Sequence, residues 1–147
     1  MLWIIIARNR PGTNTREYVH GMAYAIKQQV LSGKDRLFRY PFSNVDNRWM
    51  CWGNTPPPAI GAAKGVQMIP DHFLGMQFNH HLDERKFEPF DAEVGGHKIN
   101  LFRTPHLFRY MDEQLKKDEN FKFPMEILKP EGNLQDAIDY FQREYLR

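Results

Sequence analysis

Residues 40–54 read YPFSNVDNRWMCWGN, and they contain the single cysteine of the chain, Cys51. Residues 49–52 form a short apolar run, with polar or turn-forming residues on both sides of it. A run of this kind is typical of a strand that ends abruptly in a turn. We therefore expect Cys51 to lie at the end of a strand, immediately before a loop.

A cysteine in that position has two interpretations. A thiolate is the strongest nucleophile that a side chain offers near neutral pH, so Cys51 is a candidate for covalent catalysis. A lone cysteine between tryptophans is also a common small apolar residue of a protein core. The local pattern leaves both interpretations open.

Two further kinds of side chain are candidates for the same chemistry. Asn44 precedes Cys51 by seven residues in a turn-like stretch. Its amide could donate a hydrogen bond to the oxyanion of a tetrahedral intermediate, brace the neighbouring loop, or make a simple Asx turn. The adjacent His80 and His81, with His72 upstream, could relay a proton at Cys51 or be structural histidines. A metal site is the weakest interpretation, because HExxH spacing and a second cysteine are both absent.

Outward from this stretch, hydrophobic periodicity and turn residues predict both strands and helices in one domain, residues 1–147. Residues 84–98 are charged and glycine-punctuated, which indicates a surface loop or ribbon. The expected strands lie at residues 2–7 and 37–42, and the expected helices lie at residues 15–30, within residues 69–81, from Thr104 and from Asn133.

The composition argues against several classes of function, among them nucleic-acid binding and nucleotide binding. The 147 residues include 41% hydrophobic and 14% aromatic residues, enough for one packed core. Twenty basic residues against 18 acidic ones give a net charge of +2, with no basic stretch that would predict nucleic-acid binding. One cysteine excludes an internal disulfide and favours a reducing, cytoplasmic location. We expect no membrane span, no export signal and no nucleotide-binding loop.

The order of the motifs resembles a known family. Residues 41–45 and 49–54 resemble the segment of ubiquitin-conjugating enzymes in which a His-Pro-Asn motif leads into the strand that ends at the thioester cysteine. The closer resemblance is bacterial, to the prokaryotic ubiquitin-conjugating-enzyme-like family of PRTRC system protein B, and it runs over about residues 37–138. The further motifs that carry it are Phe73, Phe78-Asn79-His80, Gly95-Gly96, Phe123-Pro124 and Leu128-Lys129-Pro130.

This resemblance implies an α+β fold in which an antiparallel β-meander packs against helices. It implies that Cys51 is the acyl-carrying cysteine, Asn44 the motif asparagine and His80 a histidine near the thiol. The implied partners are a ubiquitin-like protein, an adenylating activating enzyme and a deconjugating metalloprotease, and no metal or organic cofactor is required. Ser43 stands in place of the motif proline, and the interval from Asn44 to Cys51 is one residue shorter than usual.

Three functions follow as hypotheses. The leading one is acyl transfer, in which Cys51 takes the C-terminal carboxyl of a ubiquitin-like protein as a thioester and yields it to an amine. The second is a catalytically inactive adaptor that keeps the conjugating fold and binds a ubiquitin-like protein or an activating-enzyme subunit. The third is a cysteine hydrolase built from Cys51 and His80, which would also need a group to orient the imidazole.

Overall fold

A computed structural model describes residues 1–13, 16–30, 32–58, 60, 63–77 and 86–145. In this part of the chain a six-stranded antiparallel sheet, a two-stranded sheet and three α-helices form an α+β fold, which confirms the predicted class. The elements are β1 (Leu2–Asn9), β2 (Arg16–Ala25), β3 (Arg36–Arg39), β4 (Val45–Asp46), β5 (Trp49–Met50), a 3₁₀ helix (Ala63–Gln67), α1 (Met68–Leu74), β6 (Phe90–Val94), β7 (His97–Leu101), α2 (Thr104–Lys117), a second 3₁₀ helix (Met125–Ile127), β8 (Pro130–Asn133) and α3 (Leu134–Tyr145).

Strand β2 is the centre of the larger sheet. One of its edges pairs with β1 along almost its whole length, and its other edge pairs with both β3 and β5. Consecutive pairing therefore runs through β1, β2 and β3. Beyond β3 the next strand is β8, from the end of the chain, while β4 pairs with β5.

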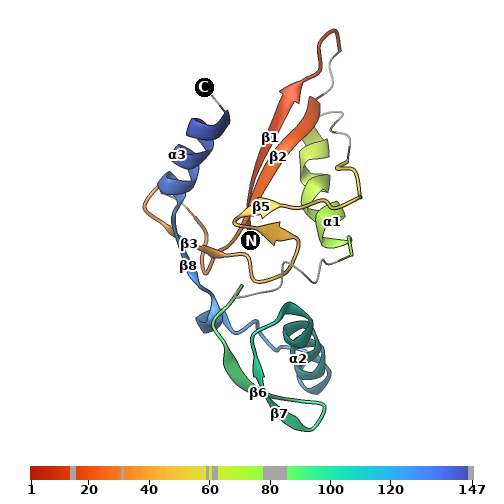
Figure 1. Cartoon of the computed structure of the whole chain (residues 1–147), viewed down its shortest axis with the longest axis vertical. Coiled ribbons are helices and arrows are strands. Elements are labelled where there is room, and N and C mark those ends of the chain that lie inside the picture. Colours follow the sequence, from red (N-terminus) through yellow and green to blue (C-terminus); the bar gives the residue numbers. More distant parts are fainter. Residues whose placement is uncertain (14–15, 31, 59, 61–62, 78–85, 146–147) are drawn as a thin grey trace.

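Helices α1 and α3 cover opposite faces of this sheet. Ala23 packs in a cluster with Ile69 and Phe73 of α1, whereas its neighbours in β2, Met22 and Tyr24, pack in a cluster that includes α3. Neighbouring residues of a strand point to opposite faces, so β2 is buried on both sides. Figure 1 shows the β1–β2 hairpin rising above the rest of the sheet, with α1 and α3 on its two sides.

The helix predicted at residues 15–30 is wrong, because this segment forms β2. The register shifts between Ile6, opposite His20, and Ala7, opposite Tyr18, so that residue 19 is skipped as in a β-bulge. Apolar residues occupy both faces of a doubly buried strand, and the bulge interrupts strict alternation. The resulting spacing imitates that of an amphipathic helix.

Most of the other predicted elements are confirmed with shifted ends. The strand at residues 2–7 is β1, and the strand at residues 37–42 is the shorter β3. The ribbon within residues 84–98 is the hairpin of β6 and β7, which extends to Leu101. Helix α3 begins after Asn133, whose Oδ1 accepts a hydrogen bond from the Asp136 N–H at 2.9 Å. The Asp136 carboxylate accepts one from the Asn133 N–H at 3.0 Å in return, which is a reciprocal N-terminal cap.

The β6–β7 hairpin and α2 form the lower part of the molecule in Figure 1 and have their own core. Phe87, Leu101 and Leu107 are fully buried there. Phe42 packs against both this core and the core under α1, and its ring stacks on the Phe108 ring of α2 with 4.8 Å between centroids. Phe42, two residues before Asn44, thus connects the core of the larger sheet with the core of the lower part.

Aromatic rings around His20 hold α3 against the sheet. The His20 ring lies 4.3 Å from the Trp49 ring and 5.8 Å from the Tyr145 ring, between centroids. Its Nδ1 accepts a hydrogen bond from the Gly21 N–H at 2.9 Å. Burial lowers the pKa of His20 below its ordinary value of 6.5.

This lowered pKa predicts a loss of stability in acid. Because the folded pKa of His20 lies below the unfolded one, its contribution is complete above about pH 6.5 and is lost as the pH falls through the folded pKa. We expect the free energy of unfolding in urea to decrease between about pH 7.5 and about pH 5, and to decrease less in His20→Gln. Equal decreases in the two proteins would show that another group is responsible.

Candidate functional site around Cys51

A tight hairpin brings the predicted site residues Asn44 and Cys51 together. In its ladder Val45 lies opposite Met50, and the Cys51 N–H donates a hydrogen bond to the Asn44 backbone oxygen at 2.7 Å. The turn consists of two residues, Asn47 and Arg48, with φ of 43° and 81°. Two successive positive φ values are typical of a type I′ turn, which closes a hairpin with two residues. The seven-residue interval is therefore the length that places residue 44 directly opposite residue 51.

Asn44 links this hairpin to the chain that follows α1. Its side chain is fully buried, and its Nδ2 donates a hydrogen bond to the backbone oxygen of Gln77 at 2.8 Å. Its φ is 70°, in the left-handed region that asparagine tolerates better than most residues. Of the three interpretations of Asn44, these contacts support the one in which the amide braces a neighbouring loop. The oxyanion role stays a prediction.

Cys51 lies where the sequence predicts it, directly after a strand. Strand β5 ends at Met50, and Cys51 is half-buried. The chain then turns, with a hydrogen bond from the Thr55 N–H to the Trp52 backbone oxygen at 3.0 Å and a positive φ of 54° at Gly53. Cys51 thus lies one residue beyond the end of β5, and part of the residue is exposed.

Trp52 connects the loop at residues 51–55, the cysteine loop, to α1 and β2. Its ring contacts the rings of Phe73 and Tyr18 edge to face, with centroids 5.3 Å and 5.2 Å away. Its indole nitrogen is buried. Burial raises the pKa of Tyr18 to about 12, so the phenol stays protonated at neutral pH. The face of Trp52 that contacts Phe73 and Tyr18 is therefore packed against α1 and β2.

His72, one of the histidines predicted either to relay a proton at Cys51 or to be structural, lies in this region. Its ring lies 5.9 Å from the Trp52 ring, between centroids, and its side chain is exposed. Buried Ile69 and Phe73 define the inner face of α1, and His72 stands beside that face. The helical spacing of α1 predicts that His72 lies beside the buried face of the helix. The sequence does not show that this helix packs against Trp52, the residue after Cys51. His80, the predicted histidine of the site, lies outside the described residues.

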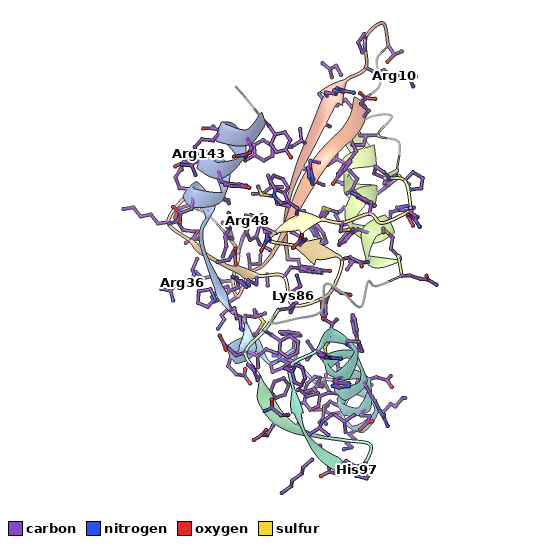
Figure 2. All side chains as sticks on the ribbon, in the orientation of Figure 1. Arg10, Arg36, Arg48, Lys86, His97 and Arg143 are labelled. Atoms are coloured by element: carbon purple, nitrogen blue, oxygen red, sulfur yellow. The ribbon has the colours of Figure 1, made fainter. Side chains whose placement is uncertain are left out.

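A polar pocket of about 170 Å³ borders the turn of this hairpin. It lies where β3 and β5 diverge from the shared edge of β2. Glu131, whose side chain is 12% exposed, accepts hydrogen bonds from Arg39 at 2.6 Å and from Arg48 at 3.0 Å. Lys86 donates to the Val45 backbone oxygen. Figure 2 shows Arg48 on the sheet and Lys86 where the sheet meets the lower part.

These contacts predict that Glu131 holds the hairpin turn in place. Replacing it by glutamine removes the charge that two guanidinium groups share, and we expect Glu131→Gln to lower the free energy of unfolding by about 2 kcal/mol. Urea denaturation measures this loss. Glu126→Gln is the matched control, because Glu126 is exposed, and its stability should stay within about 0.5 kcal/mol of the wild type. A Glu131→Gln variant with the same free energy of unfolding as the wild type would contradict this role.

The described residues hold neither a cluster of metal ligands nor a membrane-spanning helix. They contain no group of three or more histidine, cysteine, aspartate or glutamate side chains placed to hold a metal ion. No helix in the same part of the chain is long and apolar enough to cross a bilayer. No family model, curated protein or solved structure matches the sequence or the fold.

Proposed function

We propose that Cys51 carries a ubiquitin-like protein as a thioester, which it receives from an adenylating activating enzyme and passes to an amine on a target. In this proposal the α+β fold is a ubiquitin-conjugating-enzyme-like domain. The observation that carries the proposal is the direct pairing of Cys51 with Asn44 across a two-residue turn. The motif order along the chain supports it independently.

The chemistry requires two exchanges at one carbonyl carbon. First, the Cys51 sulfur attacks the thioester on the activating enzyme, so that a new C–S bond forms and the enzyme's thiolate leaves. Next, an amine nitrogen attacks the same carbon, the C–N bond of an amide forms, the Cys51 C–S bond breaks, and the amine proton passes to a base or solvent. Both exchanges need an open sulfur and a fixed position of the carbonyl more than they need a cofactor.

Asn44 has a positioning role in this proposal. Its amide donates to the Gln77 backbone oxygen, and its own backbone oxygen accepts from the Cys51 N–H. One residue thereby contacts both the cysteine and the chain that follows α1. Gln77 stands three residues before the proposed histidine, His80, in the sequence. Because the rate of acyl transfer depends on the position of the reacting groups, we expect this bracing to increase that rate by about 10- to 100-fold.

A discharge experiment tests the transfer step. The protein would be loaded with a ubiquitin-like protein by its activating enzyme, ATP would be removed, and free lysine or water alone would be offered. We expect decay of the reductant-sensitive adduct to accelerate with lysine concentration. Decay that is rapid in water and independent of amine would favour the hydrolase. Stable binding without any adduct would favour the adaptor.

A further inference from the structure

Strand β1 is an edge of the larger sheet that no described strand covers. It pairs with β2 on one side, and the described residues make no backbone ladder on its other side. It is also long, at eight residues. An open strand edge presents a row of unpaired N–H and C=O groups, which makes it a template for pairing with another chain.

The devices by which proteins usually protect such an edge are missing from most of β1. Residues 2–7 read LWIIIA, with no charged residue and no proline. The register shift in the β1–β2 ladder skips a residue of β2, so β1 itself stays regular. Arg8 comes only at the far end, where it pairs with Glu17. A regular, apolar and uncharged edge favours association.

Apolar side chains lie on both faces of β1. Trp3, Ile5 and Ala7 pack in the cluster that includes α1, and Leu2 and Ile4 pack in the cluster that includes α3. All six residues from 2 to 7 remain only half-buried. Their exposed area would be covered by one further strand that is apolar on both faces.

We propose that the strand completing this edge is β1 of a second copy of the chain, so that the protein is a symmetric dimer with a continuous sheet. Residues that lie opposite each other in an antiparallel pair point to the same face, so odd positions must pair with odd positions. The register centred on Ile5 satisfies this rule. It places Trp3 opposite Ala7 and Ile4 opposite Ile6.

Charge and the length of the paired segment select this register. With Ile5 on the two-fold axis, Arg8 lies opposite Leu2 at the outer end of the strand, and the two copies of Arg8 are kept apart. Centring on Ile6 would instead place Arg8 opposite Ile4, within the apolar region, and centring on Ile4 would pair only residues 2–6 of β1. The sequence of β1 is therefore complementary to itself, as an isologous interface requires.

Sedimentation of the full chain tests the dimer. We expect a mass of about 35 kDa, twice the 17.5 kDa of the monomer, down to a concentration of about 10 μM. Ile6→Lys should sediment as a folded monomer, because it places a charge at the centre of the edge. Leu115→Lys is the matched control and should stay dimeric, since Leu115 is an exposed residue of α2. A monomeric wild type, or a dimeric Ile6→Lys, would overturn the proposal.

Cross-linking decides the case if Ile6→Lys fails to fold. In a Cys51→Ser background, Ile5→Cys should form an intermolecular disulfide on oxidation, because Cβ atoms directly opposite in a sheet lie about 5 Å apart. Ile4→Cys in the same background should not, since Ile4 lies opposite Ile6 rather than opposite itself. Failure of Ile5→Cys to cross-link, or equal cross-linking of both variants, would contradict the register and the interface.

Discussion

Cys51→Ser is expected to retain the ubiquitin-like protein as an adduct that reductant does not remove. A serine oxygen in place of the sulfur would form an oxygen ester, which thiols cleave far more slowly than a thioester. Cys51→Ala should form no adduct at all, because it has no nucleophilic atom at that position. Denaturing gels with and without reductant measure both outcomes after reaction with activating enzyme, ATP and modifier.

The control for these variants is Asn54→Ala. Asn54 is exposed and lies in the same loop, three residues after the cysteine, so its truncation changes the neighbourhood without changing the sulfur. It should load to the same extent as the wild type. An adduct on Cys51→Ala at the wild-type level would place the acyl group elsewhere and refute the proposed role of the sulfur.

Asn44→Asp is expected to damage both stability and transfer. The aspartate has nearly the shape of asparagine and tolerates the same positive φ, but its carboxylate cannot donate to the Gln77 oxygen and would face it with a buried charge. We expect a loss of about 3 kcal/mol in the free energy of unfolding. The discharge rate of the loaded protein should fall by about 10- to 100-fold, because the hairpin and the chain that follows α1 are no longer fixed to each other.

Asn44→Gly distinguishes the effect of the side-chain hydrogen bond from that of the backbone conformation at residue 44. Glycine adopts φ of 70° without cost and leaves the Gln77 oxygen without its amide donor, but it buries no charge. Its loss of stability, measured in the same urea titrations, should be smaller than that of Asn44→Asp. If both variants were as stable as the wild type and discharged at its rate, the link between Asn44 and Gln77 would have no part in the site.

The local features of the site could be predicted from the sequence. A short apolar run between turn residues placed Cys51 correctly at a strand end, because β5 pairs with the adjacent β4 across a two-residue turn that the local sequence determines. The same is true of the start of α3, where Asn133 and Asp136 cap each other. The pairing of Asn44 with Cys51 follows from the interval between them once the turn is known to contain two residues.

Features that depend on distant packing could not be predicted. Strand β2 imitated a helix, because α1 and α3 bury both of its faces and neither helix is visible from the local pattern. The pairing of β3 with β8 joins segments nearly a hundred residues apart. The contact of His72 with Trp52 depends on the packing of α1 against the cysteine loop, which the spacing of α1 alone does not specify.

Intact-mass measurement of the loaded protein tests the central claim most directly. After reaction with the activating enzyme, ATP and the ubiquitin-like protein, we expect the chain to gain the mass of the modifier less one water, to lose it again on treatment with a thiol, and to show the modified peptide at Cys51. A chain that stays at its own mass while the activating enzyme is loaded, or that carries the modifier on another residue, would contradict the account.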